Sequence, residues 1–304
     1  MVENSTALNA RIRSSAFAWL RDQVERLGDV LPRSLLAKGF EFEGERIPLL
    51  APQGIFKPKV LTDGPLSIAT TPESPYSDAL GKDGLLRYSY RGTNVQHRDN
   101  VGLRHAMANR LPLVYFHGLV PGKYLATWPV FVVGDDPAKL TFTVAVDDAQ
   151  HLGLSQSSVA MDSATDDLRR RYATAVVRVR LHQRSFRERV LDAYKRQCAF
   201  CQFRHEEMLD AAHIVPDSQP EGEPSIQNGL ALCTLHHAAF DRYFVGLRPD
   251  YVLEVRSDLL KEEDGPTLTG IQSLHGKRIT VPTAVSNRPD AKLLSKRYLS
   301  FLNS

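Results

Sequence analysis

The sequence predicts an α+β protein whose N-terminal part is rich in strands and whose C-terminal part surrounds a metal site. Short apolar or alternating runs separated by Gly, Pro and Asp fill residues 40–150, which is the pattern of strands joined by turns. All three cysteines fall between positions 198 and 233, which favours a local metal site over a disulfide framework. A chain of 304 residues is long enough for about two domains.

The composition excludes several classes of protein. Charged residues make up 24% and hydrophobic residues 42% of the chain, values that are typical of globular proteins rather than of disordered or fibrous ones. The first residues lack the apolar stretch of an export signal, and no run approaches the ~18 apolar residues of a membrane span. We therefore expect a soluble, cytoplasmic protein. The net charge of +3 is too small to identify a partner.

The expected elements divide the chain into two domains. Apolar residues recur every four positions over 6–28, which predicts an amphipathic helix that ends at Gly28. Runs at 113–116, 130–133 and 140–146 are the clearest strands. The polar, small residues of 150–168 predict a linker between a domain at 1–160 and a second at 168–304, with its core at 185–245. We expect residues 245–304 to be structural, with a helix near the end.

A basic segment opens the second domain. Residues 169–196 contain ten Arg or Lys against two acidic residues, which favours a polyanionic partner, although a solvated charged face is the alternative. Alternating apolar residues at 173–181 predict a strand. Ser185 and Glu188 have the spacing of a capping box, which predicts that a helix begins there.

Two short cysteine motifs predict a tetrahedral zinc site. Cys198 and Cys201 form a C-x-x-C pair, and Cys233 and His236 form a C-x-x-H pair. Four such soft ligands fill the coordination shell of zinc and leave no position for water, so this ion is expected to be structural. Buried free cysteines with a surface histidine are the alternative, but they do not explain the paired spacing.

The residues between and after these pairs resemble the HNH endonucleases. Asp210-Ala-Ala-His213, Asn228 and His237 occur in the order of that family's motif, over residues 198–241. The resemblance implies a ββα-metal fold in which His, Asn and His surround one divalent ion, often on a zinc-stabilised frame. It also implies that His213 is the general base, that Asn228 orients His213 or its loop, and that His237 contacts the catalytic ion.

The chemistry of phosphodiester hydrolysis suits these residue types. It needs an activated water, neutralisation of charge on the phosphoryl oxygens and assistance to the departing oxygen. A histidine that titrates near neutral pH suits the first task. Ala212 stands where the family commonly has a metal ligand, so Asp210, which shares its side of the strand, or Asp241, one helical turn after His237, is expected to bind Mg²⁺ or a similar divalent ion beside His237.

The order of strands in the first domain resembles the SET-and-RING-associated (SRA) domain, a PUA-like barrel that recognises modified cytosine. The resemblance rests on Tyr88-Ser-Tyr90-Arg-Gly92, Asn100-Val-Gly-Leu103 and the apolar runs of residues 111–115, 124–133 and 140–144. It implies that the modified base leaves the helix stack and enters a pocket of aromatic and acidic side chains. The implied pocket residues are Tyr76, Asp78 and Tyr90, with Asp83 as a competing carboxylate; simple packing of the barrel wall is the alternative.

Together, the two resemblances imply a bacterial, type IV-like, modification-dependent restriction endonuclease that cuts double-stranded DNA containing 5-methylcytosine. A catalytically inactive binding protein, and a nuclease that recognises 5-hydroxymethylcytosine or phosphorothioate, are the alternatives. One HNH centre cuts one strand, so a homodimer or two successive encounters would cut both. The side chains expected to contact the DNA backbone are Arg91, Arg178, Arg180, Arg184 and Arg187.

Overall fold

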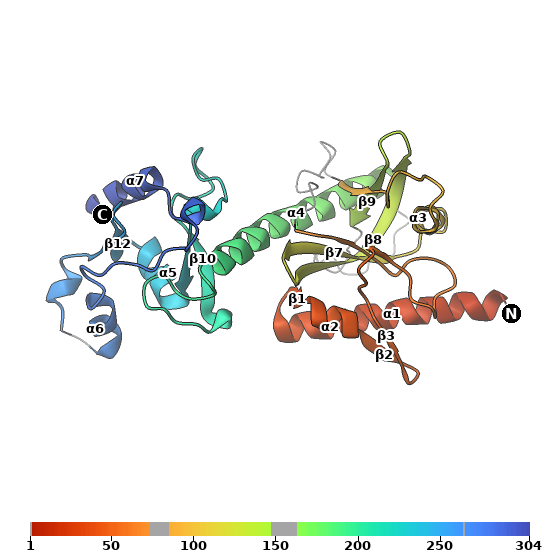
Figure 1. The fold of residues 1–304 in the computed structure, drawn as a ribbon, viewed down its shortest axis with the longest axis horizontal. Coiled ribbons are helices and arrows are strands. Elements are labelled where there is room, and N and C mark those ends of the chain that lie inside the picture. Colours follow the sequence, from red (N-terminus) through yellow and green to blue (C-terminus); the bar gives the residue numbers. More distant parts are fainter. Residues whose placement is uncertain (1, 73–84, 147–162, 264) are drawn as a thin grey trace. The chain divides into compact units, whose positions relative to one another are not determined.

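The computed structural model describes residues 2–72, 85–146, 163–263 and 265–304. The chain divides into two compact units, Met1–Leu181 and His182–Ser304, and the boundary falls within the long helix α4, Ser163–Ala193 (Figure 1). None of the helices in these described ranges combines the length and hydrophobicity needed to span a bilayer.

The first unit is a curled mixed sheet with helices on both faces. It begins with the helix α1, which confirms the helix expected at 6–28. Its helices are α1 (Val2–Leu27), α2 (Arg33–Lys38) and α3 (Arg98–Ala108). Its strands are β1 (Val30–Pro32), β2 (Phe40–Phe42), β3 (Glu45–Ile47), β4 (Ile55–Phe56), β5 (Ser67–Thr70), β6 (Leu86–Ser89), β7 (Leu113–Val120), β8 (Lys123–Asp136) and β9 (Thr141–Val146). The strands expected at 113–116, 130–133 and 140–146 are therefore confirmed.

The main sheet has the strand order β4-β5-β7-β8-β9-β6, with β1 paired to one end of β8. All of its pairs are antiparallel except β5 with β7. Within the described residues the sheet is open, with β4 and β6 as its ends. It therefore has a mixed α+β architecture with a curled sheet.

Successive side chains of β7 point to opposite faces of the sheet, and each face packs in a separate hydrophobic core. Leu113 and Tyr115 belong to the core that is shared with α3 and with α4. Val114 and Phe116 belong to the core beneath α1, where Ile12 and Leu20 are almost completely buried. This two-sided burial explains why β7 reads as a continuous apolar run rather than as an alternating one.

The strand expected at 173–181 is wrong, because this segment lies inside α4. Ala173, Val177 and Leu181 are buried at intervals of four residues, whereas Val179 is 53% exposed. Burial that recurs every four residues, together with an exposed Val179, is typical of a helix and not of a strand. The capping box is wrong for the same reason, since Ser185 lies in the middle of α4.

Two further expectations need correction. Residues 100–103, which we expected to be a strand, lie in α3. The buried Asn100 side chain instead bonds to the backbone of Arg91 and Asn94 and so fixes the loop before the helix. Most of the linker expected at 150–168 lies outside the described residues, and its last part, from Ser163, is helical.

The second unit packs one core around a small hairpin and a helix. The end of α4 supplies Val190 and Leu191 to this core, and Tyr194, directly after the helix, also belongs to it. The elements are the strands β10 (Leu209–His213), β11 (Gly229–Cys233), β12 (Val245–Leu247) and β13 (Leu253–Val255), the helices α5 (Thr234–Asp241), α6 (Pro266–Gln272) and α7 (Ala291–Leu302), and the 3-10 turns Glu206–Met208, Ile226–Asn228, Leu259–Lys261 and Val285–Asn287. Helix α7 confirms the helix expected near the end of the chain.

Candidate active site and metal centre

A ββα unit supplies the candidate catalytic residues. The strands β10 and β11 pair antiparallel, with His213 opposite Gly229 and Leu209 opposite Cys233, and α5 follows β11 directly. Gly229 permits close packing of α4 on the hairpin, because a Cβ atom there would lie 2.4 Å from Val190 Cγ2. The site therefore rests on a buried, closely packed frame.

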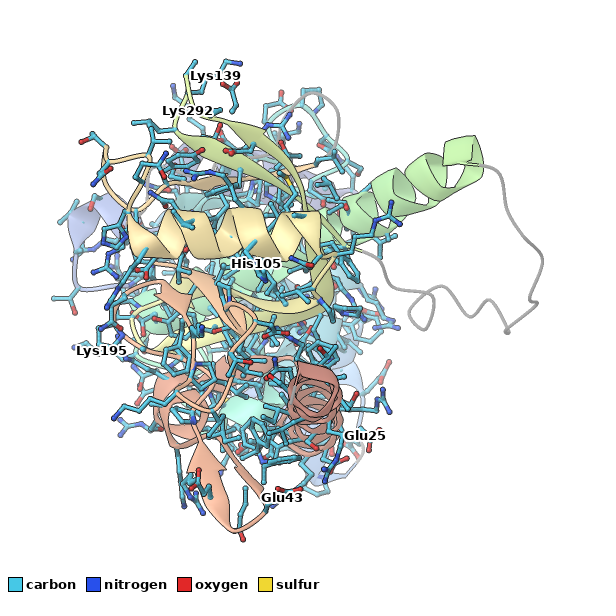
Figure 2. All side chains as sticks on the ribbon, turned by 90° about the vertical axis from the view of Figure 1, so that its right-hand side faces the viewer. Glu25, Glu43, His105, Lys139, Lys195 and Lys292 are labelled. Atoms are coloured by element: carbon cyan, nitrogen blue, oxygen red, sulfur yellow. The ribbon has the colours of Figure 1, made fainter. Side chains whose placement is uncertain are left out.

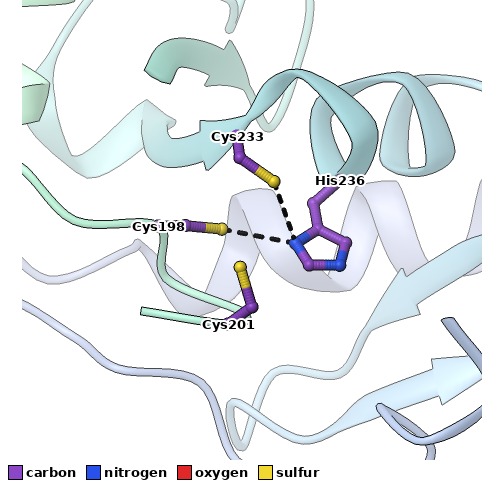
Figure 3. A group of neighbouring side chains, drawn as sticks. All are labelled: Cys198, Cys201, Cys233 and His236. Carbon is purple, nitrogen blue, oxygen red and sulfur yellow. Dashed lines mark hydrogen bonds between the residues drawn. The ribbon is translucent and has the colours of Figure 1, made fainter. Parts of the chain in front are cut away.

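The four residues with zinc-ligand spacing converge. The side chains of Cys198, Cys201, Cys233 and His236 point toward one another (Figure 3), and their ligand atoms all lie within 4.8 Å of each other. The Sγ atoms of Cys198 and Cys233 lie 3.4 and 3.3 Å from His236 Nδ1. This cluster joins the loop after α4 to the start of α5.

The cluster has the dimensions and chemistry of a four-ligand metal centre. Bonds of about 2.3 Å to sulfur and 2.0 Å to nitrogen place tetrahedral ligand atoms roughly 3.5 to 3.8 Å apart, close to the separations found here. Hydrogen bonding with Cys198, together with burial, raises the pKa of Cys233 to about 11. Metal binding must therefore displace protons from these thiols.

His213 is held as a neutral imidazole at the end of β10. Its ring stacks on Phe186 of α4, with 4.1 Å between centroids and 15° between planes. Burial lowers its pKa below the ordinary value of 6.5, an effect larger than the opposing charges of Asp217 and Asp241. Its Nε2 atom is buried and has no hydrogen-bond partner among the described residues. At neutral pH the imidazole is therefore unprotonated and able to accept a proton.

This environment predicts the acid limb of the pH–rate profile. Because only neutral His213 accepts a proton, the cleavage rate should rise with pH along a limb whose midpoint lies below pH 6.5. The rate should be measured at each pH with enough divalent ion that more ion no longer raises it. Replacing Phe186 by Leu should expose His213 and move the midpoint upward. Replacing Phe203 by Leu should not, because Phe203 contacts the ring of His205 instead. A wild-type midpoint above 6.5 would contradict the assignment.

His237 lies between two carboxylates. Its Nδ1 atom is 3.5 Å from Asp210 Oδ2, and its Nε2 atom is 3.3 Å from Asp241 Oδ2. Hydrogen bonds to Asp210 and Asp241 raise the pKa of His237 to about 9. Although burial opposes it, the hydrogen bond from His237 lowers the pKa of each carboxyl group. The three side chains form one charged cluster beside His213, whose pKa responds to all three.

The cluster suits a divalent cation with few protein ligands. Imidazole nitrogen and carboxylate oxygen are donors that such ions accept, and the two carboxylates are about half exposed. The two aspartates face different ring nitrogens, so one ion meets either Nδ1 with Asp210 or Nε2 with Asp241. The structure brings both candidate ligands to His237.

Asn228 fixes the loop that follows His213. Its side chain is fully buried and bonds to both the backbone N–H and the carbonyl of Val215, at 2.9 Å each, and donates to the Glu223 carbonyl at 3.1 Å. Its own carbonyl accepts from the Ile214 N–H. The sequence left two roles open for Asn228, namely to orient His213 itself or to position its loop. These hydrogen bonds favour the second role.

Loss of the hydrogen bonds made by the Asn228 side chain should destabilise the second unit. In Asn228→Ala, the buried N–H of Val215 and two carbonyls lose their partner, at about 1 to 3 kcal/mol for each group left unsatisfied. We expect a clear fall in the unfolding temperature of the second unit, together with reduced cleavage at temperatures where it remains folded. Gln219→Ala is the control, since Gln219 is exposed on the same loop. Equal unfolding temperatures for the two variants would contradict the stabilising role of Asn228.

Arg187, which we expected to contact the DNA backbone, has several partners within the second unit. Its guanidinium bonds to the buried Glu188 at 2.7 Å and to the carbonyls of Glu206 and Leu209, and its Nε atom lies 3.5 Å from Asp210 Oδ1. Every part of the guanidinium is thus engaged within the second unit. Arg187 joins α4 to β10 and supports Asp210.

Two residues that support the site were missed by the sequence analysis. Phe186 covers one face of His213, and only its place in a helical apolar stripe hinted at burial. Arg297 of α7 lies beneath α5, where it donates to the Phe240 carbonyl and lies 4.2 Å from the centre of the Tyr243 ring. Its guanidinium approaches Asp241 at 4.0 Å. No local motif marks an arginine 56 positions away from the carboxylate it supports.

The residues expected to bind a modified base are only partly described. Tyr76, Asp78 and Asp83 lie outside the described residues. Tyr90 is 6% exposed, stacks on Phe142 at 4.5 Å and donates from its hydroxyl to Asp135, with Arg104 5.8 Å from the ring centre. In this arrangement Tyr90 packs in the wall of the sheet core.

The other expected DNA-backbone arginines differ in their engagement. Arg91 pairs with Asp99 at 2.7 Å. Arg180 is exposed on α4, and Arg184 is partly exposed there and has a partner of its own. The side chain of Arg178 lies outside the described part.

Comparison with known proteins identifies the class of the second unit. Residues 198–248 match the HNH endonuclease family. No curated protein matches the chain. Six solved chains match, among them "Modification dependent TagI restriction endonuclease", at 14% identity and a TM-score of 0.29, with 77% of this chain and 81% of that chain covered.

A second solved structure is "Structure of the Type IV phosphorothioation-dependent restriction endonuclease ScoMcrA". It matches at 14% identity and a TM-score of 0.20, with 78% of this chain covered. The match spans 57% of that protein's length.

The second unit contains an HNH endonuclease domain, and the chain is an HNH-type nuclease. The ββα unit with His213, Asn228 and His237 lies within the matched range. Nucleases of this kind act on DNA and use metal ions.

Proposed function

We propose that the protein is a divalent-metal-dependent DNA endonuclease in which His213 is the general base. The observation that carries this proposal is a neutral, partly buried imidazole beside a charged cluster of one histidine and two aspartates. A base that is unprotonated at neutral pH and a ligand set for one cation are the two components that hydrolysis of a phosphodiester needs.

In this mechanism His213 takes a proton from the attacking water at its imidazole nitrogen. Phe186 fixes the ring plane, and the loop held by Asn228 sets the approach to the ring. His237, with Asp210 or Asp241, would hold Mg²⁺ or a similar ion. When bound, that ion would neutralise charge on the phosphoryl oxygens and assist the departing oxygen. Arg187 and Arg297 hold the two aspartates in place.

The zinc assignment is also a proposal. Three thiols and one imidazole are a donor set of structural zinc sites. Once all four are bound, the tetrahedral shell of the ion has no position left for water or substrate. We therefore assign the cluster to Zn²⁺ that stabilises the second unit without taking part in catalysis.

We further propose that the first unit directs the nuclease to DNA with a modified cytosine, and that 5-methylcytosine is the preferred base. An HNH centre alone has little sequence preference, so the large first unit needs a role in recognition. Its sheet core contains Tyr88, Tyr90 and Tyr115, which give it an aromatic interior next to polar groups such as Asp135. Tyr76, Asp78 and Tyr90 remain the proposed base-binding residues on the resemblance to SRA domains.

Basic side chains would hold the DNA backbone. Arg180 is exposed and, with Arg91, Arg178 and Arg184, would release counterions from the phosphates, so affinity should fall with a log–log salt slope of about −0.9 for each phosphate contacted. Cleavage of both strands would take a homodimer or two successive encounters.

One digestion experiment tests these proposals. Matched plasmids that are unmodified, 5-methylated, 5-hydroxymethylated or phosphorothioated are incubated with Mg²⁺, Mn²⁺ or EDTA and with wild type, His213→Ala, Asp210→Asn or Asp241→Asn. We expect metal-dependent cleavage of the methylated plasmid only, lost in His213→Ala. The aspartate variant that needs more metal identifies the ligand. Cleavage unaffected by His213→Ala would reject the catalytic assignment, and cleavage of another plasmid would reject the preference for 5-methylcytosine.

A further inference from the structure

A groove in the second unit lies beside the cluster of three cysteines and His236. It has a volume of about 670 Å³. One wall is formed by residues 200–202 and the first turn of α5, and the other by α6 and the residues that follow it, up to 278. All of its lining residues belong to the second compact unit, so the shape of the groove does not depend on the first unit.

The lining of this groove is cationic. Lys277 and Arg278 line it and are exposed, and none of the described residues that line it is acidic. Within the described part of the chain, neither of these two side chains forms an ion pair or a hydrogen bond. Two positive charges are therefore available to a ligand, and that ligand is an anion.

The other groups in the groove match the remainder of a nucleic acid backbone. Gln202 and Thr267 contribute an amide and a hydroxyl group, both of which can donate hydrogen bonds to phosphate oxygens. Leu235 is 44% exposed and offers an apolar surface that can pack against a deoxyribose ring. A groove that combines cationic, hydrogen-bonding and apolar groups suits a chain of alternating phosphates and sugars.

The groove and the proposed active site share helix α5. His236 lines the groove, whereas the next residue, His237, lies between Asp210 and Asp241. Neighbouring residues of a helix point about 100° apart, and a helix with its side chains is about 10 Å wide. A DNA strand has one phosphate for about every 3.4 Å of helix axis. A strand whose scissile phosphate lies at His237 therefore has its next few phosphates within reach of the groove.

We infer that this groove binds the phosphate backbone of the DNA strand that is cut, about two to four nucleotides from the scissile phosphate. Contacts to phosphate and sugar fix the position of a strand without selecting its bases. The groove would therefore hold the strand in register with His213 and His237, independently of how the first unit selects a site. The inference rests on the proposed function, because it takes DNA as the substrate.

Charge balance at the proposed zinc site is the competing explanation for Lys277 and Arg278. An ion of charge +2 with three thiolates has a net charge of about −1, and the groove borders that site. One cationic side chain would be enough to balance it. The two explanations differ in the effect of removing both charges, because charge balance predicts loss of zinc, whereas backbone binding predicts loss of DNA affinity with zinc retained.

The first test neutralises the two charges in a His213→Ala background, which should bind DNA without cutting it. The charge variant is Lys277→Gln with Arg278→Gln. Its control is Lys195→Gln with Lys292→Gln, which changes the net charge equally at two exposed lysines of the second unit that do not line the groove. Both control lysines are labelled in Figure 2.

The second test introduces a negative charge into the groove without disturbing the fold. In Gly270→Glu, the new Cβ atom meets no atom within 4 Å, and glycine is itself unfavourable inside a helix. Thr269→Glu is the matched control, because Thr269 is exposed on the same helix but does not line the groove. The two variants add the same charge at neighbouring positions and differ in the direction in which that charge points.

The measurement is the fluorescence anisotropy of methylated and unmodified duplexes of one sequence, recorded over a range of salt concentrations. We expect the charge variant to weaken binding of both duplexes about tenfold and to reduce the log–log salt slope by about 2, at about −0.9 for each phosphate. Gly270→Glu should weaken both about fivefold by repulsion, and Thr269→Glu should stay within about twofold of the parent. The ratio between the two duplexes, the zinc content and the unfolding temperature should not change.

A phosphate scan locates the contact on the DNA. After the cut made by the wild type has been mapped, single neutral methylphosphonates replace each phosphate of the cut strand in turn, on both sides of the cut. Replacement of a phosphate that the groove binds should weaken binding by the parent but not by the charge variant. Replacement at other contacted phosphates should weaken binding by both proteins equally.

Several results would overturn the inference while leaving the proposed function intact. They are affinities for the charge variant or for Gly270→Glu that equal those of their controls, loss of zinc in the charge variant, and a phosphate scan that is the same for parent and charge variant. A change in the solution mass of Gly270→Glu with unchanged DNA affinity would instead make the groove an interface between copies of the chain. If the wild type neither binds nor cleaves any duplex, the proposed function itself fails.

Discussion

Replacing His213 by alanine should abolish metal-dependent cleavage while leaving the protein folded. General-base catalysis contributes about 10² to 10⁴-fold to rates, so a loss of at least that size is expected in the single-turnover rate constant. The substitution removes a stacked ring, worth roughly 0.5 to 1.5 kcal/mol. It also removes the buried, unpaired Nε2 atom, whose desolvation costs about 1 to 3 kcal/mol. Because these effects oppose each other, the unfolding temperature should change little.

The control for this prediction is His205→Ala. His205 is exposed in the same unit, and Phe203 is its one aromatic contact among the described residues, so its removal should leave the rate within about twofold of wild type. Substrate affinity should be similar in both variants, since His213 is proposed to act on the water rather than to hold the phosphate. A His213→Ala enzyme that cleaves at the wild-type rate would show that another group activates the water.

Loss of the zinc site should unfold the second unit. Zinc binding contributes about 10 to 16 kcal/mol in zinc-finger peptides, which is as large as the whole stability of a typical domain, about 5 to 15 kcal/mol. We expect the wild type to contain one zinc ion per chain, and we expect Cys198→Ser to purify without zinc, to lose the thermal transition of the second unit and to lose cleavage. The first unit, which has its own two cores, should still unfold cooperatively.

Metal content by elemental analysis and two-transition calorimetry measure this effect. Met208→Ser is the matched control, because it removes a sulfur atom from a side chain that is 51% exposed and outside the cluster. A strong chelator should reproduce the Cys198→Ser result in the wild type. If Cys198→Ser lacked zinc but kept both the transition and the activity, the cluster would not be structural.

The second unit was predictable because its signals are local. Short stretches of strand or helix fix the ligand pairs at C-x-x-C and C-x-x-H spacing, and they also fix His213 three residues after Asp210. The structure brings the four ligand residues together and places Asp210 beside His237. The supporting residues were not predictable. Arg297 and Phe186 reach the site through tertiary packing from distant helices, and the sequence has no local pattern for such contacts.

The first unit was predictable only in outline. Its longer strands were found from apolar runs, but a helical face was mistaken for alternation at 173–181, because small apolar residues at every second position satisfy both periods. Burial of Ala173, Val177 and Leu181 decides between them, and burial depends on the sheet that the helix packs against. The stacking of Phe142 on Tyr90 has no local signal in the sequence either, because the two residues come from different strands and loops of the sheet.

The adjacency of His236 and His237 on α5 has a consequence for the response of the enzyme to oxidants. Neighbouring residues of a helix point about 100° apart, so one turn of α5 directs His236 to the thiol cluster and His237 to the two aspartates. Cys201 is the exposed thiol of that cluster. If the cluster holds zinc as proposed, peroxide or a disulfide reagent that reaches Cys201 would expel that ion, release the first turn of α5 and displace His237. Oxidative damage at one surface sulfur atom would thereby halt DNA cutting without touching any group that contacts DNA.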